Sequence, residues 1–116
     1  MTDKQMDLIR KQLPARSRVP WKEWTDEQKR IDKELSCIEM INSILAYNWF
    51  GESAEQIMND EENKRHNYLT EYVYLFGRDK VVELIQAQMD SIDVIRRNVH
   101  MDSDGIFYNA IIWIDD

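Results

Sequence analysis

Residues 25–50 read TDEQKRIDKELSCIEMINSILAYNWF, and this stretch decides the fold. Thr25 and Gln28 have the spacing of a capping box, in which each side chain bonds to the other residue's backbone N–H at the start of a helix. Apolar residues then recur every three or four positions along one face: Ile31, Leu35, Ile38, Ile41, Leu45 and Trp49. Gly51 is typical of a helix end. The pattern predicts a helix over 26–50, about six turns long, with a broad buried face.

A second helix is expected directly after this one. Ser53 and Gln56 repeat the capping-box spacing, and Gly77 marks the next stop. Two long helices joined by so short a turn should lie antiparallel, so 26–50 and 54–76 are predicted to form a helical hairpin. Asp79 is expected to cap a further helix, whose inner face carries Val81, Val82, Leu84, Ile85 and Met89.

The two ends of the chain show other patterns. Residues 2–13 have helical spacing up to Pro14, and 16–24 (RSRVPWKEW) read as an irregular strap. Beyond Ser91 apolar and polar residues alternate, a turn is expected at 102–105, and 106–114 (IFYNAIIWI) read as a returning strand. That strand is apolar on both faces. The strap or a second copy of the chain is therefore expected to cover it, with a homodimer through this hairpin slightly favoured.

These elements predict one α+β domain over 1–116. It is mostly helical, with an antiparallel helical hairpin, a further helix and a C-terminal β-hairpin. Its parts are a basic N-terminal helix and strap (1–24), an acidic helical body (25–90) and the β-hairpin (92–116).

Charge divides the chain in two. Residues 1–24 carry six basic and three acidic side chains, whereas 25–116 carry nine basic and nineteen acidic ones, which gives the net charge of −7. Such an imbalance bears on partners rather than on fold. The longest apolar run, 110–114, is far too short to span a membrane, and the N-terminus shows no apolar signal segment. A cytoplasmic location without membrane contact is expected.

Catalytic chemistry finds little support in the sequence. His66 has Glu62 one turn before it, but a metal site needs a third ligand. Asp102–Gly105 lacks the spacing of a calcium loop, and the three glycines form no phosphate-binding loop. Cys37 is the only cysteine and is expected to be a buried, inert thiol. We therefore expect no enzyme, no catalytic residue, no metal and no cofactor.

Two surfaces are candidates for binding. The acidic surface would contact a basic protein partner. It consists of residues that helix capping does not explain, namely Asp60, Glu61, Glu62, Asp102 and Asp104. The other candidate surface is the strap, which would contact nucleic acid or a protein partner. Its candidate binding residues are Arg16, Arg18, Trp21, Lys22 and Trp24. The alternative for the strap is that both tryptophans pack on the core while the arginines stay solvated or pair with acids. Because the acidic body repels phosphates, direct binding of nucleic acid is not expected.

Two short pieces of the chain carry a resemblance. The opening MTDKQMDLIRKQLP, and YLFGRDKVVELIQAQ followed by DSDGIFYNAIIW, resemble small accessory proteins of conjugative elements and phages of Gram-positive bacteria. Such proteins are often inhibitors of host defence nucleases, anti-CRISPR proteins among them. The resemblance implies a non-enzymatic, acidic inhibitor that occupies a nucleic-acid-binding surface of a host defence protein, such as a CRISPR nuclease. The alternatives are a nucleic-acid-binding accessory protein that uses the strap, or a scaffolding protein that assembles through its hairpin.

Overall fold

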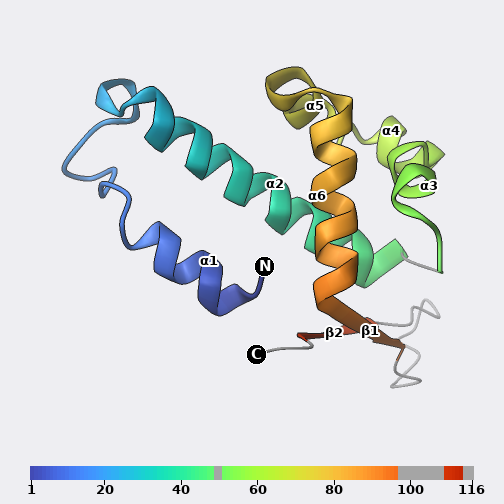
Figure 1. Ribbon diagram of the computed structural model, residues 1–116. Coiled ribbons are helices and arrows are strands. Elements are labelled where there is room, and N and C mark those ends of the chain that lie inside the picture. Colours follow the sequence, from blue (N-terminus) through green and yellow to red (C-terminus); the bar gives the residue numbers. More distant parts are fainter. Residues whose placement is uncertain (49–50, 97–108, 114–116) are drawn as a thin grey trace, which may run out of the picture.

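The long helix α2 (Asp26–Asn48) is the centre of the fold (Figure 1). The computed structural model describes residues 1–48, 51–96 and 109–113. At the start of α2 the Gln28 N–H donates to the Thr25 hydroxyl at 3.1 Å, and the Thr25 N–H donates to the Gln28 side chain at 3.0 Å. The predicted capping box and the predicted long helix are therefore confirmed.

The core lies where α6 (Arg78–Ser91) crosses the C-terminal half of α2 (Figure 1). Both helices bury a stripe of branched side chains. The buried residues of α2 are Leu35, Cys37, Ile38, Ile41, Ile44 and Leu45, and the apolar ones of α6 are Val81, Leu84 and Ile85. α6 begins two residues earlier than a helix capped by Asp79 would, so Asp79 lies in its first turn and does not cap it.

The single helix predicted over 54–76 is wrong. The structure has three short helices there: α3 (Ala54–Met58), α4 (Glu61–Arg65) and α5 (Thr70–Phe76). The Asp60 carboxylate accepts from the Asn63 N–H at 3.1 Å and so starts a new helix. Asn67 has a φ of 57°, a left-handed conformation that interrupts the helix before α5.

The predicted antiparallel helical hairpin is wrong for the same reason. In the described residues 51–76 there is no long helix, and the short helices α3, α4 and α5 instead gather beside α6 (Figure 1). Ile57 from α3, and Leu69 and Tyr72 from the chain at α5, complete the core. As separate short helices, α3 and α5 can each turn an apolar side toward α6, which one straight helix over 54–76 cannot do.

The N-terminal segment packs along the other side of α2. α1 (Asp3–Arg10) begins with a capping box between Thr2 and Gln5 and buries Met6. It is shorter than the helix predicted over 2–13. The strap contains one turn of 3-10 helix, η1 (Trp21–Glu23).

The α+β prediction is also wrong, because the core is assembled from helices and no sheet forms a layer of it. Among the described residues the only strands are β1 (Ile92–Arg96) and β2 (Asn109–Trp113), which pair antiparallel with Ile92 opposite Trp113. Two five-residue strands are too small to form a core of their own. The predicted turn at 102–105 and both ends of the predicted returning strand, 106–108 and 114, lie outside the described residues, so the C-terminal β-hairpin is not established.

None of the described helices is both long and apolar enough to cross a membrane.

Candidate functional site

Trp24 is the buried residue of the strap. Its Nε1–H donates to the Val19 carbonyl at 2.9 Å. The Trp21 ring lies 5.0 Å from the Trp24 ring, centroid to centroid, and remains half-buried. A buried tryptophan whose indole N–H is satisfied serves packing. Of the two tryptophans, Trp21 is the one still accessible to a partner.

Arg16 is bound within the protein. Its Nη2 lies 2.9 Å from Oδ2 of Asp32, a largely buried carboxylate on α2. Its guanidinium carbon lies 4.9 Å from the centroid of the Trp21 ring and 5.6 Å from that of Trp24, which is cation–π distance. Arg18 and Lys22, by contrast, are exposed. The five strap residues therefore divide into a structural pair, Arg16 and Trp24, and three accessible side chains.

A groove opens beside Trp21. It has a volume of about 400 Å³ and lies between the strap, the first turns of α2 and the end of α5. Three apolar side chains line it, namely Trp21, Leu75 and Phe76, together with four charged ones, namely Asp26, Lys29, Arg30 and Lys33. We call this the strap groove. Its size falls within the range of about 300–1,000 Å³ that is usual for ligand sites.

The three cations of the strap groove differ in their partners. Arg30 is held by Glu27 and Glu34, at 2.6 and 2.7 Å. Lys33 Nζ lies 2.7 Å from Glu71 and 5.8 Å from the Trp21 ring centroid. Lys29 has no carboxylate within ion-pair distance in the part of the chain that the structure describes. As far as the described residues show, Lys29 is therefore the groove cation that can meet an incoming anion.

Two exposed apolar residues of α5 extend this surface. Tyr74 is 88 % exposed and Leu75 is 46 % exposed. They follow Tyr72, which is buried, and a helix turns about 100° per residue, so five consecutive apolar residues (72–76, YVYLF) cannot all face the core. The sequence analysis missed Tyr74, Leu75, Lys29 and Lys33. The run YVYLF was the available signal, since it exceeds what one buried helix face can hold.

The acidic candidate surface has a structural explanation that the sequence analysis overlooked. Asp60 is the N-cap of α4, and Glu61 and Glu62 lie in its first turn, where the helix dipole favours carboxylates. Glu62 also pairs with Arg65 at 2.7 Å and lies 3.5 Å from His66. The expectation that helix capping does not account for these acids is therefore wrong. Asp102 and Asp104 lie outside the described residues.

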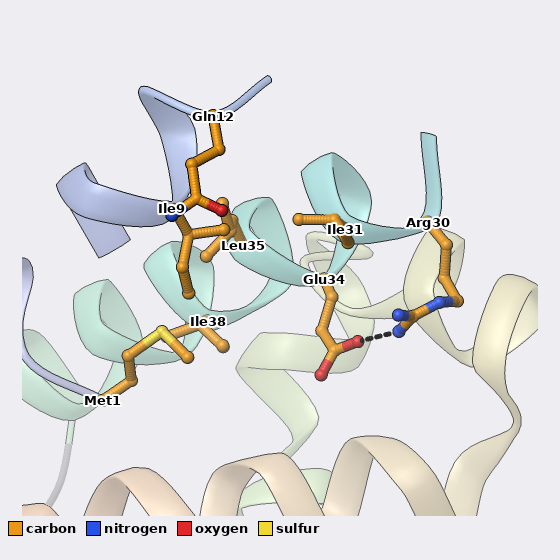
Figure 2. Close-up of a pocket in the computed structure, with 8 residues that line it drawn as sticks. All are labelled: Met1, Ile9, Gln12, Arg30, Ile31, Glu34, Leu35 and Ile38. Atoms are coloured by element: carbon orange, nitrogen blue, oxygen red, sulfur yellow. Dashed lines mark hydrogen bonds and ion pairs between the residues drawn. The ribbon is translucent and has the colours of Figure 1, made fainter. Parts of the chain in front are cut away.

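A second groove, of about 350 Å³, lies between α1 and α2 (Figure 2). Its lining is mainly aliphatic: Met1, Ile9, Ile31, Leu35 and Ile38. Figure 2 shows the ion pair between Arg30 and Glu34 at one end of it and Gln12 at another. Because its few polar groups do not converge on one point, we assign no ligand to this groove.

Cys37 and His66 are the side chains that the sequence analysis weighed for reactivity and metal binding. Cys37 is fully buried, and burial raises the pKa of its thiol to about 12, with a smaller effect from the nearby Glu34 carboxylate. His66 is exposed, and its ring stacks on Tyr68 at 5.2 Å. Within the described ranges, no three His, Cys, Asp or Glu side chains lie close enough together to hold a metal ion.

Comparisons of the chain with protein-family models, with curated proteins and with solved structures find no match.

Proposed function

We propose that the protein is a non-enzymatic protein-binding module whose contact surface is the strap groove together with Tyr74. The observation that carries this proposal is that Leu75, which lines the partly apolar groove, is 46 % exposed and is preceded on α5 by the 88 % exposed Tyr74. Exposed apolar side chains rimmed by charged ones are typical of interaction surfaces. Tyrosine, tryptophan and arginine are also the residues enriched at the centre of protein interfaces.

The arrangement suits binding better than catalysis. Among the described residues that line the groove there is no hydroxyl or thiol that could act as a nucleophile. Arg30 and Lys33 are already held by carboxylates, so they shape the rim rather than transfer protons. Rigid charged side chains around an apolar floor favour recognition of a partner's side chain.

Capture from a bacterial lysate tests the proposal. The immobilised wild-type protein and the double variant Tyr74→Ser with Leu75→Ser are compared, and captured proteins are identified by mass spectrometry. We expect the variant to lose the partner and keep its melting temperature. Leu8→Ser is the matched control, because Leu8 is also a helical leucine and is 61 % exposed, but lies on α1. Equal capture by all three proteins would contradict the proposal.

A second candidate function is the acidic inhibitor of a nucleic-acid-binding host defence protein. Residues 51–96 carry ten acidic and five basic side chains, and Glu61 and Glu62 are exposed. Figure 1 places α4 at the opposite end of the molecule from the strap, so this surface is separate from the strap groove. Dense exposed carboxylates can occupy a basic surface that otherwise holds phosphates.

Inhibition of DNA cleavage by a CRISPR nuclease tests this second candidate. The wild type should slow cleavage, and Glu61→Lys with Glu62→Lys should relieve the inhibition. Lys29→Glu, a change at the other end of the molecule, should inhibit like the wild type. Unchanged cleavage at saturating wild-type protein would eliminate this candidate for that nuclease.

A further inference from the structure

We infer that the strap groove takes an acidic peptide segment that carries an apolar side chain, presented by the protein partner. This inference rests on the proposed protein-binding function and adds the chemistry of the partner. Two properties of the groove carry it: the sign of its charge and the composition of its lining.

The sign of the local charge is opposite to that of the protein. Residues 10–33, which contain the strap and the first turns of α2, carry eight basic and four acidic side chains, in a chain whose net charge is −7. The groove lining itself has three cations and the carboxylate of Asp26, and two of the cations are paired with acids outside the lining, so Lys29 carries the local attraction for an anion. Lys29 is without a carboxylate partner among the described residues, and Arg18 and Lys22 are exposed on the adjoining strap. An acidic ligand therefore meets attraction here and repulsion over most of the remaining surface.

The apolar lining sets the second requirement. Trp21 and Phe76 are half-buried and Leu75 is partly exposed, so a ligand side chain inserted between them removes apolar surface from water. A volume of about 400 Å³ is large enough for one leucine or aromatic side chain with its neighbours. Charge alone gives fast but weak association, whereas a buried apolar anchor supplies affinity.

Nucleic acid fits the groove less well than a peptide. The Trp21 ring is already in contact with Arg16, Lys33 and Trp24 of its own chain, which leaves little of its surface for a stacked base. Asp26 lines the groove, and Glu71 is 55 % exposed beside Lys33. Every nucleotide of a nucleic acid carries a phosphate, which these acids repel. A peptide carries carboxylates only at its acidic residues, so its other residues can lie next to these acids without repulsion.

A membrane surface fits less well for a geometric reason. Trp21, Leu75 and Phe76 line a hollow, whereas side chains that enter a bilayer interface project from a convex face. Tyr74 alone is almost fully exposed beside the groove. The shape therefore favours a ligand that inserts into the protein.

Selection of peptides tests the inference. A display library of random twelve-residue peptides is selected on the wild-type protein, and binding of the enriched peptides is measured by fluorescence anisotropy. We expect sequences rich in Asp and Glu that keep one Leu, Ile, Phe or Trp. Lys29→Glu should raise their Kd about tenfold, and Leu75→Ser should raise it by a similar factor. Lys64→Glu is the matched control, because Lys64 is an exposed lysine at the far end of the molecule.

The outcomes separate this inference from the proposed function. If the enriched peptides are basic or neutral and bind the Leu75→Ser variant poorly, the ligand is not acidic, but the strap groove is still supported as the binding surface. Peptides whose binding survives both Lys29→Glu and Leu75→Ser would overturn the groove as the binding surface. The ligand class would be wrong if no peptide is enriched, or if a twenty-nucleotide single-stranded DNA or phosphatidylserine vesicles bind in a Lys29-dependent way. Lysate capture by the wild type and the Tyr74/Leu75 variant still reports on the proposed function in each case.

Discussion

The side chains of Gln88 and Asn42 are joined across the core, with Gln88 Nε2 donating to Asn42 Oδ1 at 2.8 Å. Gln88 is only 2 % exposed, and it also binds the first residue of the chain. Its Nε2 donates to the Met1 carbonyl at 3.1 Å, and its Oε1 accepts from the Met1 amine at 2.5 Å. One buried amide therefore connects α6, α2 and the segment that leads into α1.

The first prediction concerns this amide. Gln88→Ala removes the hydrogen bonds from this buried amide to the partly buried Asn42 side chain and Met1 carbonyl, which should lower the free energy of unfolding by about 1–3 kcal/mol. Urea denaturation followed by circular dichroism measures it. Gln86→Ala is the control, because Gln86 is exposed on the same helix and bonds only to Asp90 there. Equal stability of the two variants would show that the buried amide is not a structural link.

The second prediction concerns the break between α3 and α4. Asp60→Ala removes the cap that accepts from the Asn63 N–H, and it should cost about 0.5–2 kcal/mol of stability. Glu61→Ala, an exposed change in the next position, should stay within about 0.5 kcal/mol of the wild type. Thermal unfolding of the two variants provides the measurement. A stable Asp60→Ala protein would favour a continuous helix through 59–60.

The third prediction locates the core. Leu35 is 2 % exposed on α2, so Leu35→Ala leaves a cavity and should destabilise the protein by about 2–5 kcal/mol. Leu8→Ala makes the same chemical change at an exposed position of α1 and should have little effect. Denaturant midpoints compare the two. Similar midpoints would place the core away from Leu35.

The fourth prediction follows from the raised pKa of the Cys37 thiol, about 12 against an ordinary value of 9.0. Above pH 9 the thiol ionises in the unfolded chain but stays protonated in the folded one, so the folded state binds more protons. Stability should therefore fall as the pH rises from 9 toward 12. Urea denaturation at pH 8, 9 and 10 measures the slope.

Cys37→Ala is the control for that slope. The variant should be less stable at every pH because of its cavity, but its stability should fall less steeply above pH 9. Burial is the main cause of the raised pKa of Tyr72, and Cys37 makes a smaller contribution, so part of the difference between the two slopes passes through Tyr72. Identical slopes would mean that the thiol reaches water in the folded protein.

Helix starts were the most predictable feature of the fold. The pairs Thr25–Gln28 and Ser53–Gln56 form reciprocal capping bonds as their spacing predicts. The break at Asp60 obeys the same chemistry, since an Asp followed by two acids is an ordinary helix start. It was missed because the sparse apolar pattern of 59–65 was interpreted as the solvated side of one helix.

The candidate site was predictable only in part. Trp21 and the cationic strap stand out in the sequence, but the sequence does not show which strap residues are held by the protein and which are accessible to a partner. Arg16 is bound to Asp32 on α2, and no local pattern joins these two residues. The contribution of α5 was hidden as well, because Leu75 reaches the groove only through the way that α5 packs beside α2 and α6.

Local sequence was enough to predict where α2 begins, where α5 ends at Gly77 and which stripe of α2 is buried, because these features depend on bonds and spacings within a few residues. The tertiary structure decided that α6 rather than the chain after Gly51 is the main partner of α2, and that Trp21 and Leu75 share one groove. Such pairings join residues far apart in the chain. They are set by how the apolar faces of several helices are buried together, and no local pattern encodes that choice.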